Sequence, residues 1–428
     1  MTEPTATSDQ LAAELAHWRY AVDALADLDV VASPAAWAGL EHYLRLQVRD
    51  RLAAIVAALR LEVAQLDAAA GGDPPGVLRT RLLRARLLRL RNRYFQAETI
   101  LDFYGDAIAT RSNPNLAALL RGFDTVAADG LAALLRPLGL DSPPVLVYLD
   151  KGRGAAILRA GVRLWDRANP SPAAAIKLTR HNLSQPTALF HETGHQFAHL
   201  TGWTAELGDG LASTLGRRST ELADLWRSWA SEVAADVHAF ALCGWAPVPA
   251  LANVVDGPTD AVLRIIPGDP HPFALVRVLF NAALCRVWFG AGPWDTLART
   301  WADRHLGQPG HAGSDGDRLA RLSLGALGDL VEVCTRRPMG AFGGRPLSSV
   351  ADPRRASPAA LAELARVAGP SLLASTYLAR KEPVRILAWL AGRALEDPRH
   401  ATDHWRTLRG WVAALGGPPA PAQDRAAA

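Results

Sequence analysis

The chain has 428 residues, of which 49% are apolar and 21% charged, which is the composition of a folded globular protein and excludes an intrinsically disordered one. Its formal charge of +4 comes almost entirely from arginine, because Lys151, Lys177 and Lys381 are the only lysines. The charge therefore says little about partners.

Targeting signals and cysteine spacing indicate the compartment. The first residues lack a basic segment followed by an apolar core, and no apolar run reaches about 18 residues, so we expect no secretory signal, no membrane span and a cytoplasmic location. The three cysteines, Cys243, Cys285 and Cys334, are far apart in apolar helical contexts. This spacing fits buried free thiols in a reducing compartment better than disulfides.

Residues 1–138 predict an N-terminal helical region. Apolar residues recur at spacings of three and four, and the segment from Gly71 to Gly76 interrupts the longest run. Two helices on either side of this break should therefore form a long hairpin. The predicted helices are Asp9–Leu28, Pro34–Ala69, Val77–Thr110 and Leu116–Leu135.

The third of these helices carries a dense basic face, consisting of Arg79, Arg81, Arg84, Arg86, Arg89, Arg91 and Arg93. Such a face can meet nucleic acid, an anionic lipid surface or an acidic partner. It can also be a solvated face that Asp50, Glu62 and Asp67 of the preceding helix partly match. No stacking aromatic residues alternate with the arginines, which favours the solvated face and leaves an anionic partner as the alternative.

We predict that residues 139–310 form the catalytic core. Short apolar runs bounded by Gly, Pro, Asn or Asp predict strands at Pro144–Leu149, Ala155–Trp165 and Ala173–Thr179. Helices are expected at Ala188–Thr201, Thr220–Trp245 and Pro272–Phe289, with a looser segment after Trp203 and a loop over 257–270. The part of the third strand from Ile176 to Thr179 is a candidate for binding a substrate backbone as an added strand.

Residues 311–417 predict a C-terminal helical region, followed by a disordered tail over 418–428. The expected fold class is mainly α with an α+β core, in which a zincin-like domain with a small sheet is flanked by N- and C-terminal helical regions. The C-terminal helices are expected at Leu319–Thr335, Pro358–Ala368, Ser371–Ala379, Pro383–Leu395 and His404–Leu415.

The segment from Ala188 to Thr201 contains the pattern His-Glu-x-x-His. Residues four apart lie on one face of a helix, so His191 and His195 can direct both imidazoles at one ion. Glu192, next to the first of them, can reach a water molecule bound to that ion. The pattern predicts one Zn²⁺ per chain.

A third ligand is expected from the helix that follows. Glu232 and Asp236 stand one turn apart among Trp229, Val233 and Val237, and buried carboxylates on an apolar helix need a metal or a partner. Glu232 is the predicted third ligand, and Asp236 is placed to accept the other ring N–H of a ligand histidine. Ala234 and Ala235 are small, so this helix can come close to the metal helix.

The order His-Glu-x-x-His and then Glu-x-x-x-Asp resembles the gluzincins, the thermolysin-like zinc peptidases. The downstream residues His271, Pro272 and Arg277 form a His-Pro-(x)4-Arg element similar to that of the CAAX prenyl protease and HtpX-type membrane peptidases. The resemblance covers about residues 140–290. Because this chain lacks the membrane spans of those peptidases, their prenylated or membrane-protein substrates do not carry over.

The resemblance implies a role for each matching residue. His191, His195 and Glu232 would bind zinc, Glu192 would act as the base, and Asp236 would orient a ligand. It also implies that His271 and Arg277 flank the substrate oxyanion. His199, one turn beyond His195, either lines the pocket or is an ordinary hydrogen-bonded helix residue.

These residues predict metal-assisted hydrolysis of a peptide bond in a peptide or protein substrate, with Glu192 as general base. No serine or cysteine nucleophile arrangement stands out. Two alternatives stay open: an inactive scaffold stabilised by zinc, and a helical adaptor that binds an anionic partner through Arg79–Arg93. An intact Glu192 argues against the scaffold, since a structural zinc site needs no base.

Overall fold

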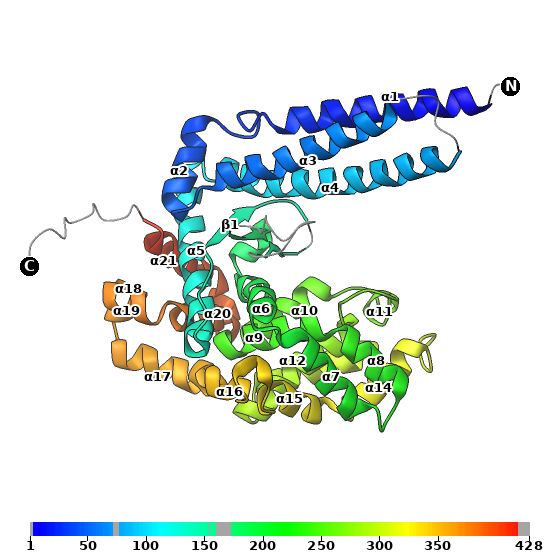
Figure 1. Ribbon diagram of the computed structural model, residues 1–428. Helices are drawn as coiled ribbons and strands as arrows, with labels where there is room; N and C mark the ends of the chain where they lie inside the picture. The colour runs from blue at the N-terminus through cyan, green and yellow to red at the C-terminus, as the bar shows by residue number, and fades with distance from the viewer. Residues whose placement is uncertain (1–2, 72–76, 153, 160–172, 418–428) are drawn as a thin grey trace, which may run out of the picture. The chain divides into compact units, whose positions relative to one another are not determined.

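The computed structural model describes residues 3–71, 77–152, 154–159 and 173–417. These residues are mainly helical with one small sheet, as the sequence predicts (Figure 1). Within the described residues the chain divides into two compact units, one formed by 1–112 with 158–175 and the other by 113–157 with 176–428. The predicted core of 139–310 stays a prediction, since the contacts of this second unit extend on both sides of it. The predicted tail at 418–428 lies outside the described residues.

The first unit is built from helices that pack side by side (Figure 1). Its helices are α1 (Glu3–Leu25), α2 (Pro34–Leu44), α3 (Val48–Ala70) and α4 (Val77–Thr110). α3 and α4 pack against each other, and α1 packs against both. The apolar residues at spacings of three and four face inward, including Leu52, Leu59, Leu87 and Leu90. The two long helices on either side of Gly71 therefore pack against each other.

The single helix predicted over Pro34–Ala69 is wrong, because the structure breaks it into α2 and α3. α2 begins at Pro34, where the Ser33 side chain accepts a hydrogen bond from the Ala36 backbone N–H. It ends at Arg45, whose φ of 56° is left-handed. The Glu41 carboxylate then accepts the Arg49 backbone N–H in the first turn of α3. Since the left-handed residue is an arginine and not a glycine, no sequence signal marks the break.

The second unit starts with α5 (Pro114–Leu135), which Asn113 caps through hydrogen bonds from the Asn115 and Leu116 backbone N–H groups. A short 3₁₀ turn follows, η1 (Arg136–Leu138). The sheet strands are β1 (Val145–Leu149), β2 (Ala156–Leu158) and β3 (Ala174–Leu178), in the order β1-β3-β2. The predicted second strand is much shorter than expected, and its continuation to Trp165 lies outside the described residues.

The position of β3 bears on one expectation. It is the central strand, hydrogen-bonded to a neighbour on each side. A paired edge cannot take a substrate backbone, but β2 is only three residues long, so the role of Ile176–Thr179 as a binding strand stays a prediction. The outer strands of this sheet are β1 and β2.

The middle of the chain is almost continuously helical. It contains η2 (Arg180–Leu183), α6 (Ala188–Thr201), α7 (Trp203–Leu215), α8 (Thr220–Ser228), α9 (Ala230–Cys243), α10 (Pro247–Val255), α11 (Thr259–Val262), α12 (Ala274–Phe289) and α13 (Pro293–His305). The looser segment expected after Trp203 is wrong, because it is helix α7. The helix expected over Thr220–Trp245 is two helices, which meet at Trp229, a buried residue with φ −87° and ψ 0°.

The remainder of the second unit is also helical, as predicted, although the helices predicted over Leu319–Thr335 and Ser371–Ala379 are each divided into two and further short helices lie between the predicted ones. The helices are α14 (Asp315–Leu324), α15 (Leu327–Thr335), η3 (Gly340–Phe342), α16 (Leu347–Val350), η4 (Pro353–Ala356), α17 (Pro358–Ala368), α18 (Ser371–Ala374), α19 (Thr376–Lys381), α20 (Pro383–Glu396), η5 (Pro398–His400) and α21 (Ala401–Leu415). α20 and α21 return to pack on α5.

Helix α9 forms the centre of this unit. It is buried on all sides from Glu232 to Cys243 and packs against α6, α7, α12 and α20. α6 lies beside it (Figure 1), and the two backbones come close where Gly194 faces Ala235. A Cβ atom added at Gly194 would lie 2.7 Å from the Ala235 Cα. The predicted close approach through small residues is confirmed, and it determines how near the side chains of α9 come to those of α6.

All three cysteines are buried and free, as predicted. Among the described residues, no helix combines the length and the apolar character that crossing a membrane requires.

Candidate metal centre

Helix α6 presents the two histidines on one face. Its apolar residues Leu189, Phe190 and Phe197 are buried in the core. Gly202, in the left-handed conformation with φ 71°, ends the helix. This packing orients the helix so that His191 and His195 share a partly buried face, with ring centroids 4.8 Å apart. The four-residue spacing has brought the imidazoles together, as a helix requires.

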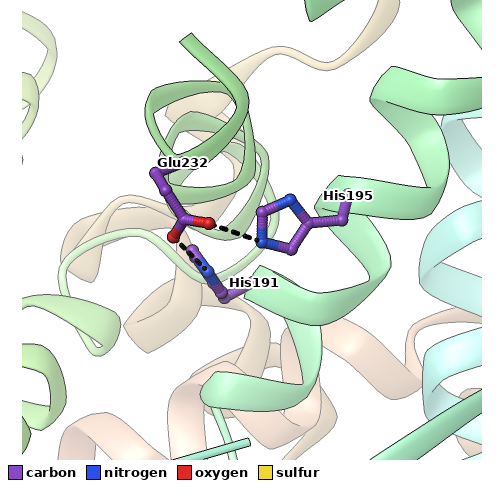
Figure 2. Close-up of side chains that lie close together, drawn as sticks. All are labelled: His191, His195 and Glu232. Carbon is purple, nitrogen blue, oxygen red and sulfur yellow. Dashed lines mark ion pairs between the residues drawn. The ribbon is translucent and has the colours of Figure 1, made fainter. Parts of the chain in front are cut away.

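Glu232 reaches this face from the first turn of α9. Figure 2 shows its carboxylate between the two rings. Its Oε2 lies 3.2 Å from the His191 Nε2, and its Oε1 lies 3.3 Å from the His195 Nε2. One ligand atom from each of the three residues lies within 4.8 Å of the other two. The structure thus brings together the three residues that the sequence selects, in an arrangement that can hold a metal ion.

Two observations test whether a metal fits this site. Donor atoms bound to one tetrahedral ion at about 2.0–2.1 Å are about 3.3–3.4 Å apart. Each histidine Nε2 lies about this far from one oxygen of Glu232, His191 from Oε2 and His195 from Oε1. The buried groups also fit a cation, because three buried carboxyl groups, those of Glu192, Glu232 and Asp236, accompany the single buried guanidinium of Arg277. A bound cation would offset this excess of acidic groups.

Asp236 lies one turn further along α9 and contacts the outer side of His191. Its Oδ1 lies 2.8 Å from the His191 Nδ1, so the ring donates this N–H to the carboxylate, while its Nε2 is directed at Glu232. This is the geometry by which a carboxylate orients a metal-binding histidine.

Two residues of α12 hold Asp236 in turn. Arg277 donates from Nε and Nη2 to the two oxygens of Asp236, both at 2.8 Å, and from Nη2 to Glu232 at 3.1 Å. Asn281 donates from Nδ2 to Asp236 at 3.0 Å. Because Arg277 and Asn281 are four residues apart, they lie on one face of α12, and both are buried. They leave Asp236 no rotational freedom.

His195 has an orienting partner of its own. Its Nδ1 lies 3.2 Å from the Oγ of Ser231, the residue directly before Glu232. If the ring N–H points at this hydroxyl, the Nε2 lone pair faces Glu232. Both histidines therefore have an oxygen atom beside Nδ1 and direct Nε2 at Glu232.

Glu192 is buried beside the two rings, and it interacts electrostatically with His191, His195, Glu232 and Arg277. Burial raises the pKa of Glu192, an effect that the neighbouring histidines partly oppose. A carboxylate whose pKa lies above its ordinary value is a better proton acceptor than an exposed one.

The pKa values of the histidine and the two carboxylates that remain in the cluster shift in opposite directions. Burial acts to lower the pKa of His191, but the hydrogen bonds to Asp236 and Glu232 outweigh burial and raise it to about 10. Burial acts to raise the pKa of Asp236, but the Arg277 guanidinium outweighs it and holds this pKa well below the ordinary range. Burial likewise acts to raise the pKa of Glu232, yet the bonds to His191 and His195 lower it. Both acids are therefore ionised at neutral pH.

His271 lies at the solvent-exposed edge of the cluster formed by His191, His195 and Glu232. Its side chain is 53% exposed, and its Nε2 lies 3.5 Å from the Glu232 Oε2. Its Nδ1 lies 2.6 Å from the Oδ1 of Asp269, which also accepts the His271 backbone N–H. Helix α12 starts at Ala274 and not at Pro272, so His271 precedes it in a loop. The predicted role of His271 at the substrate stays a prediction.

Arg277 has a different environment from His271. Its side chain is 9% exposed, and its hydrogen bonds go to Asp236 and Glu232. It therefore holds the carboxylates of α9, and its predicted contact with a substrate oxyanion stays a prediction.

Two further histidines stand outside the cluster. His199 is exposed on α6, one turn beyond His195. His238 is fully buried on α9, and its Nδ1 donates to the Phe190 carbonyl oxygen at 2.9 Å. Burial lowers the pKa of His238 to about 4, which keeps the ring neutral. His238 lies six residues beyond Glu232 and therefore on another face of α9.

Sequence reasoning missed Ser231, Asn281 and Asp269. Each had a positional signal: Ser231 precedes the predicted ligand, Asn281 follows Arg277 by four residues, and Asp269 precedes His271 by two. Serine, asparagine and aspartate are so common on helices and in loops that these positions become informative only once the fold has placed their partners.

A separate cavity of about 460 Å³ lies in the second unit, lined by residues of α8, α11 and α14, including Glu221, Asp260 and Asp315. Its lining contains no residue of the metal cluster.

Comparison with protein-family models, curated proteins and solved structures gives no match. The function must therefore be inferred from the cluster itself.

Proposed function

We propose that this protein is a zinc-dependent peptidase of the gluzincin type, in which His191, His195 and Glu232 hold the metal and Glu192 is the general base. The observation that carries the proposal is the arrangement of these four residues. Two imidazoles and one carboxylate converge from α6 and α9, and a second carboxylate is buried directly beside them. The zincin-like nature of the surrounding domain is part of the same proposal.

The donor set supports zinc over other metals. Two imidazole nitrogens and one carboxylate oxygen are ligands of catalytic zinc, which keeps a fourth position open. Magnesium and calcium instead prefer six or more oxygen ligands. With zinc bound, the oxygen contacts of His191 with Asp236 and of His195 with Ser231 would hold the neutral rings in the tautomer that binds through Nε2.

Zinc bound at this site would lower the pKa of a water molecule to about 7 and polarise a scissile carbonyl. The carboxylate of Glu192 would accept a proton from the attacking water and later deliver it to the leaving amine. Asp236 would keep the His191 ring in place, while Arg277 and Asn281 would keep Asp236 ionised and fixed. His271, exposed at the rim with Asp269 on its Nδ1, would donate from Nε2 to the developing oxyanion.

Two substitutions separate metal binding from hydrolysis. Glu232→Ala should sharply reduce the zinc content of the purified protein, measured by elemental analysis. Glu192→Gln should retain one zinc per chain and abolish cleavage of a broad peptide library, because an amide cannot accept the proton. Glu363→Gln, an exposed glutamate of α17, is the matched control and should change neither.

Three results would argue against the proposal. If Glu232→Ala retained its zinc, the residue would not be a ligand. If Glu192→Gln cleaved peptides at the wild-type rate, the base would be another group. If the wild-type protein held one zinc per chain but cleaved nothing in the library, an inactive zinc-stabilised scaffold would be favoured.

A further inference from the structure

Helix α4 of the first unit presents a long face to solvent. Arg81, Arg84, Leu88, Arg91 and Phe95 follow each other at spacings of three and four residues, so they form one row along the helix. All five are exposed. The opposite face of α4 is buried against α1 and α3 through residues such as Leu83, Leu87 and Leu90. The basic row is therefore on the outer side of a packed helical layer.

The arginines of this face have few acidic partners. Glu62 of α3 pairs with Arg93, but Asp67 pairs with Arg19 of α1 instead. Within the described part of the chain, Arg81, Arg84 and Arg89 make no ion pair. The sequence from Val77 to Ala97 contains no aspartate or glutamate at all. Of the acidic residues expected to match this face, Glu62 therefore pairs with one of its arginines, Arg93. The positive charge of Arg81, Arg84 and Arg89 is not balanced by an ion pair among the described residues.

Large apolar side chains lie among these arginines. The exposed fractions are 74% for Leu78, 60% for Leu82, 48% for Leu88 and 43% for Phe95. Single exposed leucines are common, but a series of them on one exposed helix surface indicates an interaction site. The Arg91 guanidinium lies over the Phe95 ring, 5.5 Å from its centre, so that ring is already covered on one face.

The combination of arginine and leucine identifies the kind of partner. Phosphate groups of a nucleic acid would use the arginines, but a single-stranded one also needs free aromatic faces for its bases, and leucine offers none. The interface of an anionic membrane uses both types of residue. Leucine and phenylalanine enter the boundary between headgroups and acyl chains, while arginine heads remain at the lipid phosphates.

We propose that the exposed face of α4, from Leu78 to Phe95, binds the surface of a bilayer that contains anionic phospholipid. The helix lies along the interface with its leucines inserted and Arg81, Arg84 and Arg89 on the phosphates. This inference stands on residues of the first unit and is independent of the metal centre. It gives the protein a means of reaching a membrane surface.

The test is flotation of the full-length protein with vesicles. One set consists of phosphatidylcholine alone, and the other contains one third phosphatidylglycerol. We expect binding to the anionic vesicles that weakens as the salt concentration rises from about 0.1 M to about 0.5 M. Each arginine near an anionic surface contributes about a fivefold gain in binding. The triple variant Arg81→Gln, Arg84→Gln and Arg89→Gln should therefore bind about 100-fold more weakly.

The matched control replaces three arginines of the second unit, with the changes Arg217→Gln, Arg399→Gln and Arg409→Gln. These residues are also exposed and, among the described residues, make no ion pair. This control should bind like the wild type. The double variant Leu82→Gln with Leu88→Gln should bind at least tenfold more weakly, since the leucines enter the interface. Circular dichroism of each variant would establish that it is folded.

Several outcomes would overturn the proposal. Absence of binding to anionic vesicles would do so, as would equal loss of binding in the control triple variant. Unchanged binding of the leucine variant would leave only charge attraction and no inserted face. If duplex DNA or RNA bound while vesicles did not, the partner would be nucleic acid. If the wild type self-associated through this face and the leucine variant were monomeric, the partner would be a second copy of the chain.

Discussion

Gly194 offers a direct test of how the metal site is assembled. It is the residue of α6 directly before His195, and it faces Ala235 of α9. A methyl group at this position would lie 2.7 Å from the Ala235 Cα and 3.0 Å from the Ala235 carbonyl oxygen. Ordinary van der Waals contact begins at 3.4 Å, so the two helices must separate by about 0.7 Å in Gly194→Ala. Backbone atoms on both sides leave no side chain to rotate away.

This displacement is large on the scale of a metal site. Ligand distances are tolerated within about 0.2 Å, whereas α9 carries Glu232, whose carboxylate must meet His191 and His195 on α6. We expect Gly194→Ala to weaken zinc binding at least tenfold, because the Glu232 carboxylate would move away from His191 and His195. Overpacking of the core should also destabilise the fold by about 1–3 kcal/mol.

Gly392→Ala is the matched control. Gly392 lies inside helix α20, and a Cβ atom there would meet no other atom within 4 Å. The same substitution should therefore be neutral or stabilise the fold by up to about 1 kcal/mol, since alanine is the better helix former. Zinc affinity would be measured by competition with a chromophoric chelator, and stability by thermal unfolding. If Gly194→Ala bound zinc as tightly as Gly392→Ala, the close contact of α6 and α9 would not control the site.

Three further substitutions probe other parts of the protein. Asp236→Asn should weaken zinc binding or activity by about 10–100-fold, because it removes the carboxylate that orients His191; a chelator competition showing no change would assign Asp236 a purely structural role. His271→Ala should lower kcat by about 100-fold with KM and zinc content nearly unchanged; loss of zinc would instead make it a ligand. Asp317, buried in the first turn of α14, accepts hydrogen bonds from Arg321 and from the Gly307 and Gly313 backbone N–H groups, and these lower its pKa below 3.8. Its stabilisation is therefore complete at neutral pH and is lost as the pH falls below about 4. Urea unfolding should find Asp317→Asn about 1–3 kcal/mol less stable than the wild type at pH 7, and a difference that did not shrink toward pH 3 would contradict this assignment.

Residues that act through local geometry were predictable without a structure. His191 and His195 share a face because four residues make about one helical turn. The two carboxylates of α9 were recognisable because they interrupt an apolar helix, where burial without a partner is too costly. The hairpin of α3 and α4 followed from apolar spacing and from the break at Gly71. In each case the physical cause lies within a few residues of sequence, so the pattern can be read along the chain.

The tertiary structure decided what depends on distant segments. Only the packing of α12 shows that Arg277 and Asn281 use their donors on Asp236, and only the strand order shows that β3 lies between β1 and β2. The end of α2 at Arg45 was equally hidden, because a left-handed arginine leaves no signature in sequence. The pairing of Asp67 with Arg19, which leaves arginines of α4 without a carboxylate, could not be foreseen either. A charged side chain reaches several neighbours, and the fold determines which of them it meets.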